Sequence, residues 1–386
     1  MRRQPRAAAL ALAALLASLA AALPAAAEGP AISGSIETSA AASLGAGASP
    51  AFSLGFEEYA NLRLKAKAGE RGTVHAALNL VAASGSLAPP EAVLAAAPYA
   101  TPFVSGGGYA AALELERLYC RITGETMDLE AGLLRLAFGY GQAFSPMDFL
   151  SARNPLLPEA RPRGVLGVAA SAYPSDLARI EAFAAAGRDP FETSGEGALV
   201  GALGELHGRS ASLETLYAYE APSEAYGRGV HRAGLSLKLE AGAGIVLDAL
   251  YSHDGGERSG LGGLEGSLGL DYSLGGGDLY LLCQYLYRGP GSVGDLTGGN
   301  YLYAAASWRV DDYRSISLAS TANLDDLSAL SFLSYETEPF QGLAVLFRAA
   351  LPLDRAALGI GDGEGELGPD ALGYRVSFSA RAKLRF

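Results

Sequence analysis

The connections between the strand-like segments of this sequence alternate between short and long, and this alternation constrains the fold more than any single motif. From Ala31 onward about eighteen segments have the pattern of β-strands, and the even-numbered connections between them are short and mostly rich in Gly, Asp or Pro, as tight turns require. The odd-numbered connections 84–111, 139–163, 187–195, 254–262, 289–299 and 352–373 are long, whereas Leu324-Asp325-Asp326 is short where a long one is expected. A soluble β-sandwich gives no reason for such an asymmetry. The short connections are Gly69-Glu70-Arg71, Gly124-Glu125-Thr126, Pro174-Ser175-Asp176, Leu206-His207-Gly208, Ala241-Gly242, Gly275-Gly276-Gly277 and Asp311-Asp312-Tyr313.

Many of the segments alternate apolar and polar residues, as a strand with one apolar and one polar face does. The pattern is strict from Tyr374 to Phe386, where every even position is apolar or aromatic and every odd position is polar or charged. Lengths of about 10 to 13 residues suit a tilted strand that crosses a membrane, although 177–205 is Ala-rich and 278–288 gives no clear choice of face. The predicted strands are 31–40, 52–67, 72–83, 112–123, 127–138, 164–173, 177–186, 196–205, 209–219, 228–240, 243–253, 263–274, 278–288, 300–310, 314–323, 327–336, 341–351 and 374–386.

The first 27 residues have the pattern of a secretory signal peptide. Three arginines precede an Ala/Leu run over 7–23, and Ala27 ends a small-residue cleavage site before Glu28. A retained N-terminal membrane helix is the alternative interpretation. Without the three arginines of this leader, the 29 basic residues fall to 26 against 41 acidic ones, which gives a net charge of −15. This charge argues against nucleic acid as a partner, because a phosphate backbone requires a basic surface.

No later stretch is apolar over the roughly 18 residues that a membrane helix needs. Export, the lack of such a stretch and a positive mean hydropathy together favour a β-barrel. In barrel strands polar residues alternate with apolar ones, so no long apolar stretch arises. We therefore predict an all-β fold, a transmembrane antiparallel up-and-down β-barrel of about 18 strands within a range of 14–18, formed by residues 28–386 as a single domain. Barrels of about sixteen to eighteen strands leave an aqueous channel.

Two stretches carry a resemblance to known proteins. The segment Tyr374–Phe386 resembles the C-terminal closing strand of Gram-negative outer-membrane β-barrels, which usually ends in Phe and is read by the barrel assembly machinery. The stretch from Glu116 to Pro174 resembles porin-like barrels in which a Gly-Arg-Gln strand is followed by Trp-Gly and Asn-Pro-x-Asp. This chain has Leu133-Leu134, Phe138 and Ser145-Pro146-Met147-Asp148 at those places. From the resemblance we therefore expect the porin-like fold but not a shared substrate. The resemblance implies an outer-membrane location, with outer-membrane lipid and the assembly machinery as partners.

In general porins, the third external loop folds inward and narrows the pore. By this resemblance, the loop over 139–163 would form a constriction together with the inward-facing Arg121 and Arg135. Ser145 in an N-cap position, followed by Pro146, also predicts that a short helix begins in this loop. A solvated surface loop with ordinary charges is the alternative. The candidate constriction residues within the loop are Asp148, Arg153, Glu159, Arg161 and Arg163.

A second group of candidate residues is basic. One part of it shares the polar face of the predicted strand 52–67, and the other part shares that of the strand 374–386. Closure of the barrel separates these two strands by a single strand, so the side chains would form one basic wall of the lumen that favours anionic solutes. The alternatives are that they balance lumenal carboxylates, or that those near the strand ends lie among lipid headgroups. The group consists of Arg63, Lys65, Lys67, Arg375, Arg381, Lys383 and Arg385.

Few residues suggest catalysis or a cofactor, and we expect none. The four histidines lack metal-ligand spacing, and His231 has no identifiable serine partner of the kind that outer-membrane phospholipases use. The acidic loop over 361–370 offers oxygen ligands for Ca²⁺ but lacks the EF-hand spacing, and a flexible surface loop is the alternative. Cys120 and Cys283 lie far apart in strand order and are predicted to be free thiols.

The preferred function is a passive outer-membrane pore for small hydrophilic solutes, which selects by size and charge without covalent chemistry. A surface adhesin or structural barrel with a narrow or plugged lumen is the competing class, and an outer-membrane lipid hydrolase is a third. Whether the barrel forms homo-oligomers is open.

Overall fold

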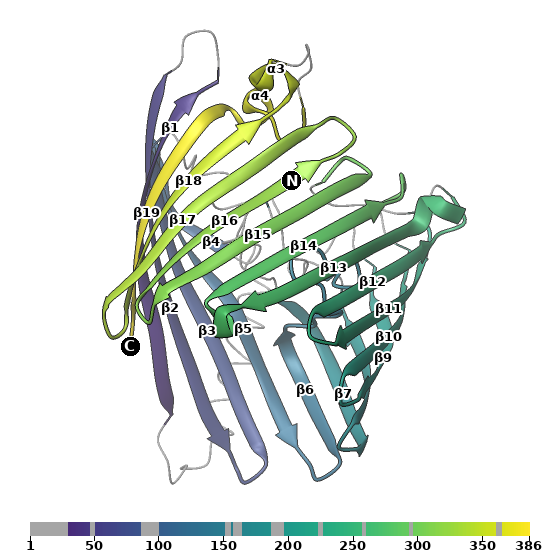
Figure 1. Ribbon diagram of the computed structural model, residues 1–386. Helices are drawn as coiled ribbons and strands as arrows, with labels where there is room; N and C mark the ends of the chain where they lie inside the picture. The colour runs from purple at the N-terminus through teal and green to yellow at the C-terminus, as the bar shows by residue number, and fades with distance from the viewer. Residues whose placement is uncertain are drawn as a thin grey trace.

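Eighteen antiparallel strands form a closed barrel in the computed structural model (Figure 1). Neighbours in sequence pair along the wall, and β19 returns to pair with β1. The predicted fold class is therefore confirmed. The structure describes residues 30–46, 51–85, 100–150, 156, 164–186, 197–222, 227–256, 260–292, 296–359 and 365–386. Within these residues, no helix has the length and apolar character needed to cross a membrane.

The strands of the wall follow the predicted segments closely, and short turns separate them at one end of the barrel. The bounds are β1 (Ala31–Gly45), β2 (Phe52–Ala68), β3 (Gly72–Gly85), β5 (Tyr109–Thr123), β6 (Met127–Leu134), β7 (Val165–Ser175), β8 (Ala178–Ala185), β9 (Leu199–His207), β10 (Ala211–Glu220), β11 (Val230–Glu240), β12 (Gly244–His253), β13 (Leu264–Leu274), β14 (Leu279–Arg288), β15 (Asn300–Asp311), β16 (Arg314–Asn323), β17 (Ser328–Phe340), β18 (Leu343–Leu353) and β19 (Tyr374–Arg385).

One additional strand, β4 (Ala100–Gly106), lies within the long connection predicted over 84–111. It forms a tight hairpin with the beginning of β5, and Gly106, Gly107 and Gly108 at the turn all have positive φ. Because β3 occupies one edge of β5, β4 and β6 share the other edge. Short helices lie at the long-loop end: η1 (Gly260–Gly263), α3 (Arg355–Leu358) and α4 (Pro369–Leu372), the last two above β18 and β19, whereas η2 (Gly275–Gly277) forms a short turn (Figure 1).

The barrel has an apolar outer surface and a polar interior, the reverse of a soluble protein. Leu62, Leu268 and Phe378 point outward and are about half exposed, whereas the inward-facing Asp248 and Gln284 are fully buried. Aromatic side chains surround the short-turn end, as they do at a membrane interface, and include Trp308, Tyr313, Phe340 and Phe386. The outer surface therefore fits the apolar layer of a bilayer.

The seam between β1 and β19 closes over eleven residue pairs, from Ser35 with Arg385 to Gly45 with Tyr374. Gly34 and Phe386 then exchange two backbone hydrogen bonds of 2.9 and 3.1 Å. The Phe386 ring covers the position where Gly34 would carry a side chain, a contact that supports a glycine in a strand.

Replacement of Gly34 by alanine is expected to weaken this closure. The new Cβ would lie 2.4 Å from the Asn61 carbonyl oxygen and 2.7 Å from Cζ of Phe386, and such overpacking costs about 1–3 kcal/mol. The folded fraction after refolding into detergent, measured by heat-modifiable gel migration, should fall. Gly266→Ala is the matched control, because the nearest atom to its new Cβ is 3.7 Å away. Equal behaviour of the two variants would contradict the role of the seam contact.

Candidate functional site

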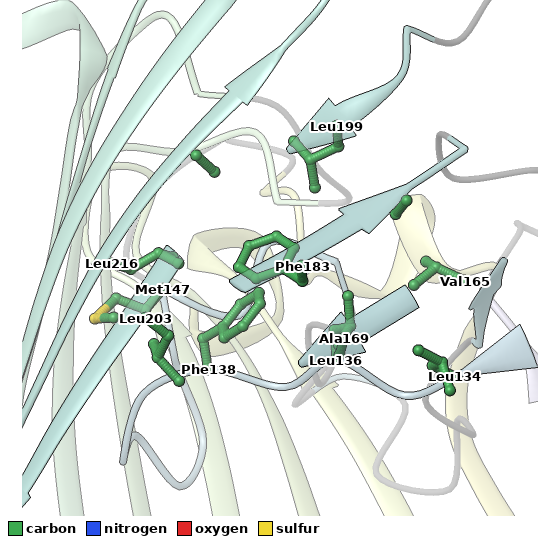
Figure 2. Packing of buried hydrophobic residues seen from close by; sticks show 12 residues of the cluster. Leu134, Leu136, Phe138, Met147, Val165, Ala169, Phe183, Leu199, Leu203 and Leu216 are labelled. Carbon is green, nitrogen blue, oxygen red and sulfur yellow. The ribbon is translucent and has the colours of Figure 1, made fainter. Parts of the chain in front are cut away.

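After Leu134 the chain leaves the barrel wall and enters the interior, so the strand predicted over 127–138 ends four residues early. We call the described segment 135–150 the inner loop. Its apolar residues Leu136, Phe138 and Met147 are buried against inward-facing side chains of β7–β10. Figure 2 shows Phe138 beside Phe183 on β8, with ring centroids 5.2 Å apart. Because the loop covers this part of the wall, β7–β10 are apolar on both faces there, and the alternation over 177–205 is weak.

The backbone of the inner loop runs across the inner face of five strands, where lumenal side chains bind it. The Gly139 N–H donates to Glu214 on β10 at 2.8 Å, and the Gly141 N–H donates to Asp248 on β12 at 3.0 Å. The Ala143 N–H donates to Oε1 of Gln284 on β14 at 2.9 Å. Between the first two of these amides, the Tyr140 N–H donates to Ser236 on β11 at 3.0 Å, so inward-facing polar residues of several strands hold the loop backbone.

Side chains of the loop add to these contacts. Gln142 donates to Asp271 on β13 at 3.3 Å and accepts from the Tyr280 hydroxyl on β14 at 2.7 Å. Burial, with nearby Glu214 and Glu205, raises the pKa of Tyr140 to about 12, so its phenol stays neutral at physiological pH. The inner loop therefore presents neutral polar groups along the wall.

The loop reverses direction at Ser145. Its hydroxyl lies 2.8 Å from Oδ2 of Asp248 and 3.0 Å from the Phe138 carbonyl oxygen, and the Asp148 N–H closes a turn to the Ser145 carbonyl at 3.0 Å. The prediction that a helix begins at Ser145 is wrong, since a turn follows it. The physical reason is that the hydroxyl is oriented as a donor toward Asp248 and the Phe138 carbonyl, and the Asp148 N–H that it would accept pairs with the Ser145 carbonyl.

The returning part of the loop packs against β11. Gly234 provides the space for Met147, because a Cβ there would lie 3.0 Å from Cγ of Met147. The Arg232 guanidinium lies 4.7 Å from the centre of the Phe149 ring and pairs with Glu220 at 2.7 Å. The inner loop is therefore fixed on both its outgoing and its returning arm.

A second external connection also enters the mouth of the barrel. Glu366 accepts hydrogen bonds from the Thr297 N–H at 2.7 Å, from Asn323 at 2.8 Å and from the Tyr301 hydroxyl. Leu367 is fully buried beside Leu330, in a cluster that Leu156 of the predicted third loop also contacts. Both long connections therefore narrow the external half of the lumen.

These contacts bear on the predicted Ca²⁺ loop. Residues 361–364 lie outside the described residues, and the Glu366 carboxylate is already engaged by three donors. In the part of the chain that the structure describes, no group of three or more His, Cys, Asp or Glu side chains is placed to hold a metal ion.

The predicted basic residues of β2 and β19 lie on inward-facing positions, with β1 between the two strands. Lys383 pairs with Glu37 of β1 at 2.6 Å, and Arg381 lies 3.7 Å from the same carboxylate. Arg385 lies 3.9 Å from Glu338, and Arg375 donates to the Ala46 carbonyl at the other end of the strand. Two carboxylates, Glu37 and Glu338, therefore offset part of the positive charge of the β19 part.

The β2 part of the group is different. Arg63, Lys65 and Lys67 are exposed to the lumen, and in the described part of the chain neither Arg63 nor Lys65 has a carboxylate partner. Half the circumference away, the inner wall carries Glu214 and Asp248, which bind the inner loop. Uncompensated positive charge thus faces the wall that holds the loop.

The predicted constriction residues are only partly described. Arg121 on β5 pairs with Glu130 on β6, two residues before the strand ends at the short-turn side. Arg135 and the buried Asp148 both belong to the inner loop. Arg153, Glu159, Arg161 and Arg163 lie outside the described residues.

Sequence reasoning missed the residues that anchor the inner loop: Glu214, Ser236, Asp248 and Gln284. A signal was present, because all four occupy inward positions between β10 and β14, and Glu214, Ser236 and Asp248 on three consecutive strands are directly paired in register. His231 faces outward, and its Nδ1 shares a hydrogen bond of 2.8 Å with the Tyr217 hydroxyl. Both cysteines are free.

No protein-family model and no curated protein sequence matches this chain. Solved outer-membrane proteins match its structure at low identity. OccAB4 of Acinetobacter baumannii is 8% identical with a TM-score of 0.58, and the match covers 93% of this chain and 98% of that one. OprD of Pseudomonas aeruginosa is 8% identical with a TM-score of 0.54, over 92% and 95% of the two chains. The outer membrane protein OpdK of the same organism is 11% identical with a TM-score of 0.52, over 92% and 98%. The chain therefore has the fold of these outer-membrane proteins, a closed antiparallel β-barrel of 18 strands.

Proposed function

We propose that this protein is a passive outer-membrane channel for small hydrophilic solutes. The observation that carries the proposal is the inner loop, which is bound along the polar interior by side chains of β10–β14. A barrel of this size has room for an aqueous lumen, and a fixed inward loop sets its narrowest section. In this proposal the barrel selects by size and charge and performs no covalent chemistry.

Conductance across a planar lipid bilayer tests the channel directly. The purified, folded barrel should produce stepwise current increments whose size scales with salt concentration. The engaged Glu366 and the buried Leu367 at the external mouth favour one competing function, a structural or adhesive barrel with a closed lumen. A folded barrel that inserts into the bilayer without current steps would support this alternative and contradict the channel.

We further propose that the channel favours anions, because Arg63 and Lys65 leave uncompensated positive charge on the lumenal face of β2. Fixed charges along a pore raise the local concentration of ions of the opposite sign.

The double variant Arg63→Glu with Lys65→Glu should shift the channel from anion selectivity toward cation selectivity. In a tenfold KCl gradient, the reversal potential is expected to move toward the cation-selective sign, and the shift should shrink as the salt concentration rises because lumenal charges are screened. Arg71→Glu in a periplasmic turn is the control, because it reverses one charge on a side chain that is mostly exposed beside Glu125. An unchanged reversal potential in the double variant would show that β2 does not determine selectivity.

A further inference from the structure

The outer surface of the barrel carries one acidic side chain where lipid is expected. Among the outward-facing positions of the described strands, Glu58 on β2 is the only carboxylate. It lies within the apolar band, since Leu54 and Phe56 precede it on the same face and Leu62 and Leu64 follow it. An ionisable side chain facing lipid destabilises a barrel and usually has a function there.

Glu58 is only partly satisfied within the chain. The Thr38 hydroxyl on β1 donates to its Oε2 at 2.7 Å, and no residue of the described ranges donates to its Oε1. Both side chains are exposed on the outer surface. A second group is therefore required to complete the hydrogen bonding of this carboxyl in a membrane.

The surface beside Glu58 suits close contact with another protein. One outward position from Thr38, a groove of about 410 Å³ crosses the seam of the barrel. Small and large side chains both line it, so side chains of another protein can enter between the large ones. The small ones include Ala40, Ala42, Ala349 and Ala380, and the large ones include Leu54, Phe347 and Phe378.

We propose that two copies of this chain associate through this face, around a two-fold axis parallel to the membrane normal. Two identical barrels inserted in the same direction carry Glu58 at the same depth, so this symmetry brings the two Glu58–Thr38 pairs together. One proton shared between the carboxyl groups removes their repulsion and satisfies Oε1 of each. The described outer face offers no cation in the apolar band, so an ion pair with another copy is not available.

Cysteine cross-linking in intact outer membranes tests this interface. In a chain whose Cys120 and Cys283 are replaced by alanine, Ala40→Cys should yield a cross-linked species of twice the monomer mass. A chain that retains only Cys283, which is exposed on β14 a third of the circumference from β1, is the control and should stay monomeric. An Ala40→Cys chain that remains monomeric, or that cross-links to a different protein, would overturn the proposal.

Charge exchange at position 58 tests the carboxyl pair itself. Glu58→Lys alone should reduce the cross-linked fraction by about tenfold, which corresponds to about 1.4 kcal/mol. When it is co-expressed in equal amount with a differently tagged Glu58 chain, mixed dimers should exceed the half of all dimers that random pairing gives, because a Lys–Glu pair then forms at the interface. Absence of this preference overturns the two-fold pairing. If Glu58→Lys does not insert, Ala380→Trp, which fills the groove, should abolish cross-linking in a folded barrel, and persistence of the dimer would overturn the interface.

Discussion

Replacement of Asp248 by alanine is expected to release the inner loop from the wall and to increase single-channel conductance. This carboxylate accepts from the Gly141 N–H at 3.0 Å, from the Tyr140 N–H at 3.4 Å and from the Ser145 hydroxyl at 2.8 Å. Its loss leaves the part-buried Gly141 N–H without its acceptor, at about 1–3 kcal/mol, whereas the Tyr140 N–H keeps Ser236 at 3.0 Å. Current recordings should show larger and noisier steps, and hydrogen exchange over 139–145 should accelerate.

Asp271→Ala provides the graded control for this prediction. Asp271 lies on the adjacent strand, but its recorded contact with the loop is a single hydrogen bond of 3.3 Å from Gln142. We expect this variant to change the conductance little. If both variants keep the conductance of the parent chain, the inner loop does not set the narrowest section of the lumen.

Arg232→Ala should be the most destabilising substitution on the inner wall. The Arg232 and Glu220 side chains are 5% and 9% exposed and lie 2.7 Å apart, so removal of the cation leaves a buried carboxylate without its partner. Breaking such a pair costs about 3–5 kcal/mol. The midpoint of urea unfolding, followed by tryptophan fluorescence in detergent micelles, should fall accordingly.

The double variant Arg232→Ala with Glu220→Ala distinguishes the cost of an unpaired Glu220 carboxylate from the cost of losing the Arg232 side chain. Because no buried charge then remains unpaired, its unfolding midpoint should lie above that of Arg232→Ala. A double variant that is no more stable than Arg232→Ala would contradict the unpaired Glu220 carboxylate as the cause of the loss.

The wall of the barrel was predictable because its constraints are local. Alternation along Tyr374–Phe386 defines the two faces of β19, and short Gly- or Asp-rich turns define the order of the hairpins. The structure confirms the short connection at Leu324-Asp325-Asp326 as a turn in which the Asp325 N–H donates to Asn323 at 2.9 Å. Such signals depend on residues a few positions apart.

The interior was less predictable because it depends on residues far apart in sequence. The Ala143 N–H and Gln284 are separated by 141 positions, and no local pattern links them. The same contacts explain why the strand at Leu134 ends early and why Phe183 and Leu203 are apolar on an inward face. Ser145 illustrates the error that follows, since a capping serine accepts from a backbone N–H, whereas this hydroxyl donates to Asp248, 103 positions away.

The seam between β1 and β19 has a consequence for the rate of folding. It joins Lys383 to Glu37 across 346 positions of the chain, so its closure has nearly the largest loop entropy that this sequence permits. Contacts between residues so far apart in the sequence form slowly. Until they form, the edges of β1 and β19 expose unpaired backbone groups that pair readily with other chains. The time between hairpin formation and ring closure is therefore the period in which this protein is most vulnerable to aggregation and proteolysis.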